Sequence, residues 1–169
     1  TSFSNILVIG KGPLVNGSHF KDFDRYASLP EVVDAGWEEN TEVYKAAQAA
    51  FRQEPGPRLI YIAVRRKNGE GETQEVPDND SSSGQGAGDI LEDITETVKR
   101  VLGMPGWYGL ALVDAEEEEY DRVAGLVENV EKIFAFCTKK KKNPLGGKGY
   151  MRTFGVYSED GYVHIAWMA

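Results

Sequence analysis

The residues that could do chemistry lie in a few short stretches. The glycine loop Gly10-Lys11-Gly12 follows an apolar run and could present backbone amides to a phosphate. A dinucleotide-binding fingerprint needs a third glycine three residues after Gly12, where Val15 stands, and Pro13 removes one amide donor. A Walker motif would end in Gly-Lys-Ser or Gly-Lys-Thr, and this loop lacks the hydroxyl. We therefore interpret the loop as a plain turn.

Thiol and imidazole groups are few. The chain has one cysteine, Cys137, and two histidines, His19 and His164. Their spacing matches no local zinc motif, so we predict no metal site. A nucleophilic pair between Cys137 and either histidine stays open, because such partners meet in space and not along the chain. The apolar run that contains Cys137 favours the other interpretation, in which the thiol packs as a small core hydrophobe.

Acidic residues gather where a predicted strand passes into a predicted helix. Asp114 ends the strand, where open α/β sheets often place functional groups, but its position before a helix favours an N-cap. Glu116, Glu117, Glu118 and Glu119 follow it. Consecutive residues point around a helix in different directions, so these glutamates are better explained as a solvated first turn than as a cation site.

The basic block consists of Lys139, Lys140, Lys141 and Lys142. In a chain of net charge -8 it could dock onto an acidic patch of another subunit, with the Glu116–Glu119 run as an available complement. The alternative is a solvated loop that keeps a strand edge soluble. These two runs are the candidate inter-subunit contacts, and we predict no catalytic, cofactor-binding or metal-binding residue.

Length and charge bound the class of protein. A chain of 169 residues fits one domain with a sizeable core. The acidic balance argues against a nucleic-acid partner, because affinity for phosphate backbones comes from many Lys and Arg contacts. No stretch approaches the roughly 20 apolar residues that span a bilayer. We therefore expect no nucleic acid, membrane or cofactor, and a place in the cytosol or in an assembled particle.

Alternating apolar patterns predict the framework that positions these residues. The predicted strands are 5–10, 58–65, 107–113, 132–138 and 151–157. Capping patterns and amphipathic faces predict helices that begin near Ser28, Thr41, Asp89 and Asp114. Residues 163–168 fit either a strand or a helix. Strands that alternate with helices predict an α/β fold with a mixed, largely parallel sheet covered by helices on both faces.

One long segment interrupts this pattern. Residues 66–88 are rich in Gly, Ser, Asp, Asn and Glu and have almost no apolar side chains. Such a segment cannot bury enough surface to offset its ordering entropy, so we predict an exposed polar loop. The whole of 1–169 is otherwise expected to form a single α/β domain.

A series of segments carries a family resemblance over most of the chain outside that loop. The segments are Asn5–Gly10, Arg25–Val32, Asn40–Phe51, Pro57–Ala63, Trp107–Leu112, Lys132–Phe136, Tyr150–Tyr157 and Ala166–Ala169. Asn40–Phe51 is similar to a Pro-Glu-Tyr-Lys-Ala-Ala-Gln helix, and Trp107–Leu112 to a Trp-Tyr-Gly strand. In number and order the segments resemble the contractile tail sheath proteins of bacteriophages. Family members normally continue further and carry terminal arms, so the apolar ending at Ala169 suggests a fragment.

The resemblance implies a structural subunit and not an enzyme. Sheath subunits assemble into stacked rings around the tail tube and contract to drive the tube through the host envelope. The implied partners are copies of the chain, tail tube proteins and baseplate proteins, with no small-molecule substrate. The implied location is the virion, and the host cytoplasm during assembly. Two alternatives stay open: a small nucleotide-binding α/β enzyme that uses Gly10–Gly12 and Asp114, and a host-contact module that projects from a phage particle.

Overall fold

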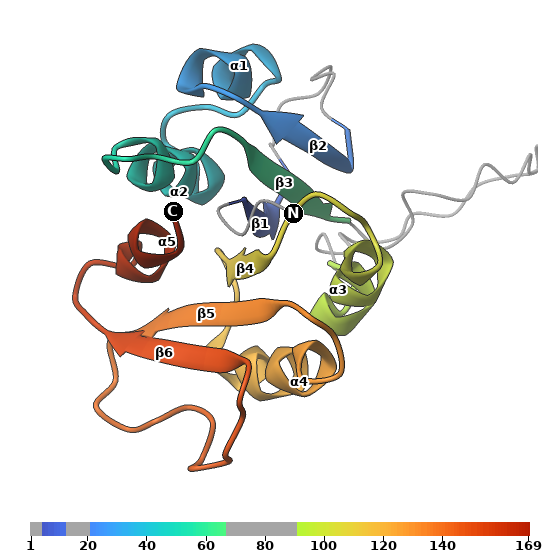
Figure 1. The fold of residues 1–169 in the computed structure, drawn as a ribbon, viewed down its shortest axis with the longest axis vertical. Coiled ribbons are helices and arrows are strands. Elements are labelled where there is room, and N and C mark those ends of the chain that lie inside the picture. The colour runs from blue at the N-terminus through green and yellow to red at the C-terminus, as the bar shows by residue number, and fades with distance from the viewer. Residues whose placement is uncertain (1–4, 13–20, 67–90) are drawn as a thin grey trace, which may run out of the picture.

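The chain folds into a six-stranded sheet with helices on both faces (Figure 1). The computed structural model describes residues 5–12, 21–66 and 91–169. The strands are β1 Ile6–Lys11, β2 Phe23–Tyr26, β3 Ile60–Arg65, β4 Gly109–Leu112, β5 Ile133–Thr138 and β6 Thr153–Tyr157. The helices are α1 Leu29–Asp34, α2 Glu42–Phe51, α3 Ile94–Leu102, α4 Glu117–Val127 and α5 Val163–Met168.

The strand order is β2-β3-β1-β4-β5-β6. Every pairing in this described sheet is parallel except that of β2 with β3. The predicted mixed, largely parallel sheet is thus confirmed. The chain leaves β1 toward β3 and then crosses back to β4, so the topological switch point lies between the carboxyl ends of β1 and β4. Open α/β sheets bind ligands at such points.

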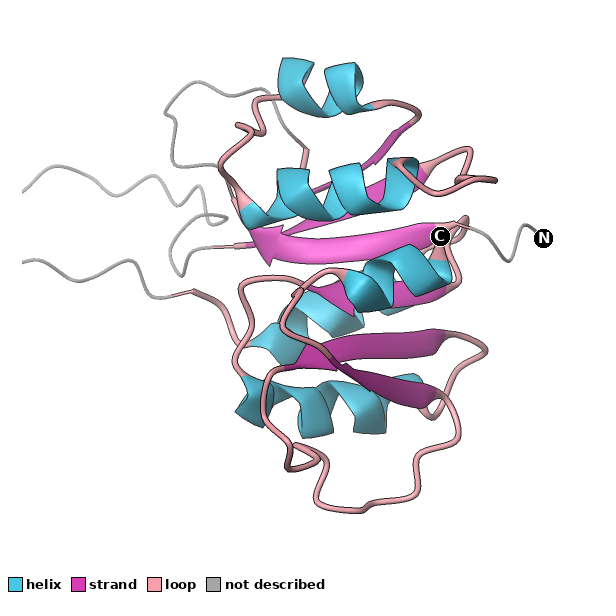
Figure 2. Cartoon of the chain, turned by 90° about the vertical axis from the view of Figure 1, so that its left-hand side faces the viewer, coloured by secondary structure: helices cyan, strands magenta, loops and turns pink. Residues whose placement is uncertain are grey.

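Each face of the sheet has its own apolar core because side chains alternate along a strand. Leu7 and Ile9 of β1 point toward the face covered by α3 and α4. Ile6 and Val8 point toward the face covered by α1, α2 and α5. Figure 2 shows the same layers, with α2 and α5 in front of the sheet and α3 and α4 behind it. The predicted cover of helices on both faces is confirmed.

Two helices begin later than predicted. The Asp93 carboxylate accepts a hydrogen bond from the backbone N–H of Thr95, so α3 begins after Asp93 and not at Asp89. The prediction that Asp114 caps α4 is wrong. Glu116 is the N-cap of α4 and forms a capping box with Glu119, whose carboxylate accepts from the Glu116 N–H at 3.0 Å.

The structure also decides one ambiguous segment, adds one strand and leaves one predicted loop untested. The ambiguous segment 163–168 is a helix, and β2 is a strand that the sequence patterns did not predict. Of the predicted polar loop 66–88, all residues after Arg66 lie outside the described part of the chain. Across the three described ranges, no helix has the length and apolar character needed to cross a membrane.

Candidate functional site

Charged and polar side chains gather in two clusters near the carboxyl ends of the strands. The first, which we call the paired cluster, consists of Arg65, Glu92, Arg100 and Glu119 on the α3 and α4 face. The second, which we call the cavity cluster, lines a cavity of about 260 Å³ beside the start of α2 and α5. Its polar members are Glu42, Asp114, Cys137, Lys139, Tyr162 and His164.

In the paired cluster every charge has a partner. The Arg65 guanidinium donates to both oxygens of Glu119, at 2.8 and 3.2 Å, and its Nε donates to the backbone carbonyl of Glu92 at 2.7 Å. Arg100 donates to the Glu92 carboxylate at 2.6 Å and to the Val64 carbonyl at 2.9 Å. The Arg65 and Glu119 side chains are only 13% and 11% exposed. The cluster therefore joins β3, α3 and α4, and Glu119 is not the solvated residue that the sequence predicted.

Glu92 also forms hydrogen bonds with Arg66, the residue that precedes the segment 67–90. Its backbone N–H donates to the Arg66 carbonyl at 2.8 Å, and its carboxylate accepts from the Arg66 N–H at 2.9 Å. Burial of Glu92 opposes ionisation, but hydrogen bonds from Arg66, Thr97 and Arg100 outweigh it and lower the pKa of this carboxyl. Glu92 is thus held ionised in a structural role.

In the cavity cluster, by contrast, the buried imidazole of His164 lacks a hydrogen-bond partner within the described structure. His164 is 2% exposed, and neither ring nitrogen has a hydrogen-bond partner within the described structure. Burial lowers the pKa of His164 to about 4, so the imidazole is neutral at pH 7. The Tyr162 hydroxyl donates to Glu42 across the same cavity. An uncharged buried imidazole offers one donor and one acceptor to whatever occupies the cavity.

Asp114, which lines the same cavity, has a strained backbone conformation. Its φ of 58° lies in the left-handed region that disfavours residues other than glycine. Burial raises the pKa of the Asp114 carboxyl, although the positive charge of Lys11 opposes the shift. Strained backbone and a destabilised carboxylate at a topological switch point are features that ligand-binding sites share.

Cys137 lines the same cavity and is half-buried, so the prediction that it packs in the core is wrong. Its Sγ donates to the Asp160 carbonyl at 3.3 Å. Burial raises the pKa of the Cys137 thiol, which keeps it protonated at neutral pH. The structure places Cys137 and His164 around one cavity, but a protonated thiol that donates to a carbonyl is not an activated nucleophile.

The glycine loop is partly a strand. Gly10 and Lys11 belong to β1, and residues 13–20 lie outside the described structure. A Cβ at Gly10 would stand 2.4 Å from Val43 Cγ2 and 2.8 Å from Val113 Cγ2. The described part of the loop therefore needs glycine so that α2 can approach the sheet, and not for contact with a phosphate.

The lysine block partly meets its predicted acidic complement within one chain. Lys140 Nζ lies 2.8 Å from a Glu117 oxygen, and the Thr138 hydroxyl donates to the other oxygen at 2.5 Å. Burial of Glu117 opposes ionisation, but these two hydrogen bonds outweigh it and lower the pKa of the carboxyl. Lys139, Lys141 and Lys142 are exposed, as are Glu116 and Glu118. Contacts of these runs between subunits stay a prediction.

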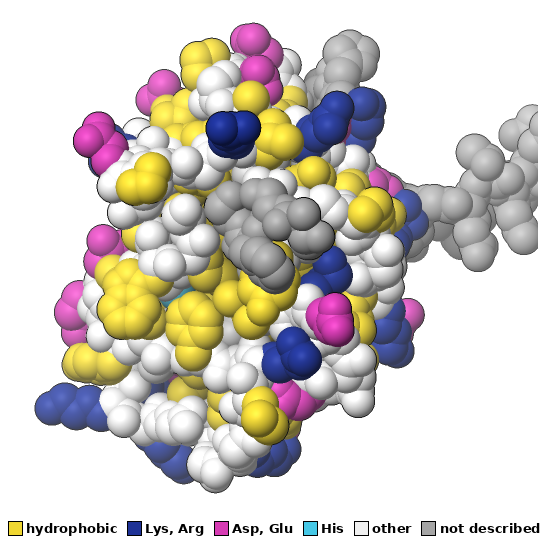
Figure 3. All heavy atoms as spheres, viewed as in Figure 1, with side chains coloured by type: hydrophobic (Ala, Val, Ile, Leu, Met, Phe, Trp, Pro, Cys, Tyr) yellow, Lys and Arg dark blue, Asp and Glu magenta, His cyan; other side chains and the backbone are white. Residues whose placement is uncertain are grey.

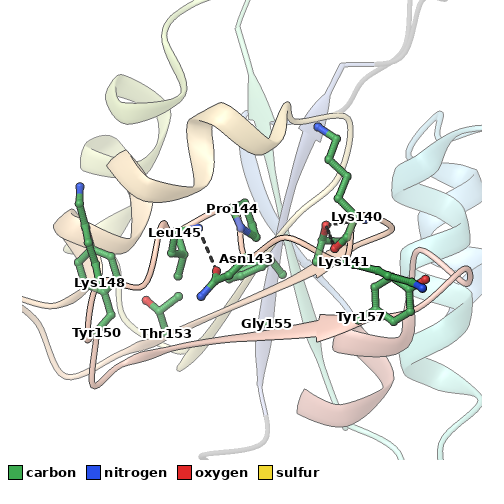
Figure 4. Close-up of a pocket in the computed structure, with 12 residues that line it drawn as sticks. Lys140, Lys141, Asn143, Pro144, Leu145, Lys148, Tyr150, Thr153, Gly155 and Tyr157 are labelled. Carbon is green, nitrogen blue, oxygen red and sulfur yellow. Dashed lines mark hydrogen bonds between the residues drawn. The ribbon is translucent and has the colours of Figure 1, made fainter.

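A pocket opens between the lysine block and β6 (Figure 4). We call it the lysine pocket; its volume is about 290 Å³, and no Asp or Glu lines it. Its polar lining is Thr138, Lys140, Lys141, Asn143, Lys148, Tyr150, Thr153 and Tyr157. At the bottom of the pocket Gly155 packs closely against Phe136, because a Cβ at Gly155 would stand 2.3 Å from the Phe136 ring. Of its three lysines, Lys140 and Lys148 are paired with Glu117 and Asp121, which leaves the Lys141 ammonium for an anionic group.

Hydrogen-bonding groups of the lysine pocket also favour an anion. The Thr153 hydroxyl is shielded from solvent and has no partner in the described ranges. The Asn143 side-chain oxygen accepts from the Leu145 N–H at 2.9 Å, which leaves the amide NH₂ as the donor end. Over the described residues, no group of three or more His, Cys, Asp or Glu side chains is arranged to hold a metal ion. Comparison of the chain with protein-family models, curated proteins and solved structures finds no match.

Proposed function

We propose that this chain is a structural subunit of a contractile phage tail sheath. In this role its copies form stacked rings around the tail tube and contract to drive the tube through the host envelope. The observation that carries the proposal is the ordered series of sheath-like segments. They overlap in turn with β1, α1, α2, β3, β4, β5, β6 and α5, and of the described helices they leave out α3 and α4.

The edges of the sheet also support an assembly role. β6 is an outermost strand, and its sequence Thr-Phe-Gly-Val-Tyr contains no charged residue. Its outer side has no strand partner in the described structure. Monomeric proteins usually protect such an edge with charges, prolines or a covering element. An uncharged edge strand suits a protein whose surfaces contact other copies.

The experiment is immunogold electron microscopy of phage-like particles from cells that produce the protein, with antibodies raised against residues 91–169. Under the proposal, gold labels the full length of the tail between head and baseplate, and the labelled length shortens on contraction. Labelling confined to the tail tip would favour a host-contact module. Absence of label from contractile tails, with the same antibodies detecting the protein elsewhere in the cell, contradicts the proposal.

A second candidate function, the binding of a nucleotide or other small ligand, is favoured by the cavity cluster with its unpartnered His164. A thermal-shift screen with common nucleotides tests it. A ligand at 100 times its dissociation constant should stabilise the fold by about 2.7 kcal/mol. His164→Phe should abolish that shift if the ligand sits in the cavity. A screen without any shift would count against this second candidate.

A further inference from the structure

We propose that the lysine pocket receives the acidic turn Glu38–Glu39 of a second copy of the chain. The inference rests on the proposed function, because it names a contact by which copies would join. It replaces the Glu116–Glu119 run as the main acidic complement of the lysines. Glu117 and Glu119 already have cationic partners, Lys140 and Arg65, within their own chain.

The lysine pocket contains a lysine that has no ion pair in the described structure. Lys140 and Lys148 pair with Glu117 and Asp121 at 2.8 and 2.5 Å, but Lys141 has no ion pair in the described structure. From 139 to 158 the sequence contains six Lys or Arg residues and no Asp or Glu. A carboxylate that enters the pocket can pair with Lys141 and meets amide and hydroxyl donors, whereas Lys140 and Lys148 are each already paired with a carboxylate of their own chain.

The ligand side is an acidic surface with unpaired charges. From 28 to 44 the sequence contains five Asp or Glu residues and no Lys or Arg. Two of them have local partners: Glu31 accepts from the Ala27 N–H, and Glu42 pairs with a lysine. Asp34, Glu38 and Glu39 are exposed and have no ion pair in the described ranges.

The acidic turn is also held in one shape. The Thr41 N–H and hydroxyl both donate to the Glu38 carbonyl, at 3.0 and 2.6 Å. Trp37, directly before it, is 1% exposed and anchors the turn in the core. A turn that is already ordered loses little conformational entropy when it binds.

No ion pair or hydrogen bond joins the two surfaces in the described structure, although Glu42 and Lys139, which lie close to them in sequence, line one cavity. The acidic turn lies beside α1 near the β2 edge, whereas the lysine pocket lies at the β6 edge (Figure 1). Figure 3 shows Lys and Arg side chains along the lower end of the molecule, and both acidic and basic side chains around the α1 end. We therefore assign their contact to two copies joined head to tail, an arrangement that closes into rings or extends as a helix.

Apolar side chains accompany both charged surfaces. Val33, between the acidic residues of α1, is 43% exposed. Tyr157 lines the lysine pocket and is 53% exposed, and Met151 nearby in sequence is 94% exposed. Protein interfaces combine such an apolar centre with a polar rim. The same two surfaces thus offer both charge complementarity and apolar area to bury.

Zero-length cross-linking tests the contact directly. A carbodiimide couples lysine amines to carboxylates that touch, and a mixture of ¹⁴N- and ¹⁵N-labelled chains identifies cross-links between copies by mass. At low salt and high protein concentration, we expect mixed-isotope cross-links from Lys141 or Lys142 to Asp34, Glu38 or Glu39. The pairs Lys140–Glu117 and Lys148–Asp121 should cross-link within single chains and serve as internal controls. Salt at 1 M should suppress the mixed-isotope products, because the Debye length falls to about 3 Å.

Charge reversal supplies the matched variants. The double variants Glu38→Lys/Glu39→Lys and Lys141→Glu/Lys142→Glu each lack one of the two coupling groups, so each alone should lose the mixed-isotope product and serves as the blank. An equimolar mixture of the two variants should regain it, because each then carries the complement of the other. The inference is overturned if only the internal controls form, or if mixed-isotope products join the lysines to Glu116 or Glu118.

The two proposals can fail separately. Gold along the tail without the mixed-isotope product would leave the sheath function standing and refute the acidic-turn contact. Conversely, the mixed-isotope product with no label on any contractile tail would support the head-to-tail contact and refute the sheath function.

Discussion

The paired cluster and the cavity cluster lie near the same end of the sheet but are built in opposite ways. In the paired cluster, Arg65 and Glu119 satisfy one another with two hydrogen bonds, so their low exposure costs little electrostatic free energy. In the cavity cluster, His164 is more deeply buried and has no hydrogen-bond partner in the described structure. The paired cluster joins β3, α3 and α4. The cavity cluster leaves a buried imidazole without a hydrogen bond, which lowers the stability of the fold.

This difference separates a structural group of charges from a candidate binding site. Removing one member of the paired cluster leaves an uncompensated buried charge. Removing the unpartnered imidazole leaves nothing uncompensated, because an apolar ring of similar shape needs no hydrogen bond. The two clusters should therefore respond in opposite directions to comparable substitutions.

The largest effect is expected for Glu119→Gln. The substitution leaves Arg65 13% exposed and without its carboxylate, which should lower the free energy of unfolding by about 3 kcal/mol. Urea denaturation of the variant measures the loss. The control is the exposed neighbour Glu118→Gln, which should change the stability by less than about 0.5 kcal/mol. Equal effects of the two substitutions would show that the pair contributes nothing specific.

The next effect is the pH dependence that comes from His164. Its pKa is about 4 in the folded chain and 6.5 when unperturbed, so between these values the unfolded chain binds more protons. Its contribution is therefore fully present above pH 6.5 and is lost as the pH falls toward 4, a loss of about 3 kcal/mol. Asp114, with a raised pKa, acts with the opposite sign, since its stabilising contribution at low pH is lost as the pH rises.

His164→Phe isolates that contribution. The variant should be at least as stable as the parent at pH 7 and should lose less stability between pH 6.5 and 4.5. Urea midpoints measured across this range give both quantities. Parallel pH profiles for the variant and the parent would mean that the imidazole is not buried without a partner.

A smaller effect is expected for Asp114→Asn. Asparagine tolerates a left-handed φ better than most residues and carries no charge to desolvate, so the variant should gain up to about 1 kcal/mol at pH 7. Asp114→Ala keeps the positive φ and should not show that gain. Chemical denaturation compares the two variants, and a stability of the alanine variant equal to or above that of the asparagine variant would exclude backbone strain at this position.

The smallest effect on stability belongs to exposed charges outside both clusters. Lys141→Glu/Lys142→Glu should change the free energy of unfolding by less than about 0.5 kcal/mol while it abolishes the mixed-isotope cross-link. The thermal midpoint and the cross-link yield, measured on one preparation, separate folding from association. A clear loss of stability would mean that these lysines hold their own loop in place.

Local patterns in the sequence predict most of the framework but few of its boundaries. Apolar runs identify β1, β3 and β5 because both faces of these strands are buried. The edge strand β2, with sequence Phe-Asp-Arg-Tyr, has no such run and exists through its pairing with β3. The start of α4 shifts from Asp114 to Glu116 because the chain makes a left-handed turn at Asp114, which a capping pattern does not reveal.

The clusters were harder to predict because their members come from distant parts of the chain. Arg65 and Glu119 are 54 residues apart in sequence, so no local spacing points to their ion pair. His164 belongs to a segment whose apolar pattern fits two structures, and only the packing of α5 buries it. The Lys140–Glu117 pair was predicted in part. The sequence indicated that the lysine and glutamate runs are complementary, but not that two of their members pair within one chain.

The junction of Arg66 and Glu92 has a practical consequence. Their hydrogen bonds hold the backbone at Arg66 and the backbone at Glu92 side by side, whatever sequence connects these two residues. Doubling the length of a flexible connection costs only about 0.6 kcal/mol in closure entropy. An epitope or a small fluorescent reporter could therefore be spliced in at this junction, which would let the protein be followed by light microscopy in living cells.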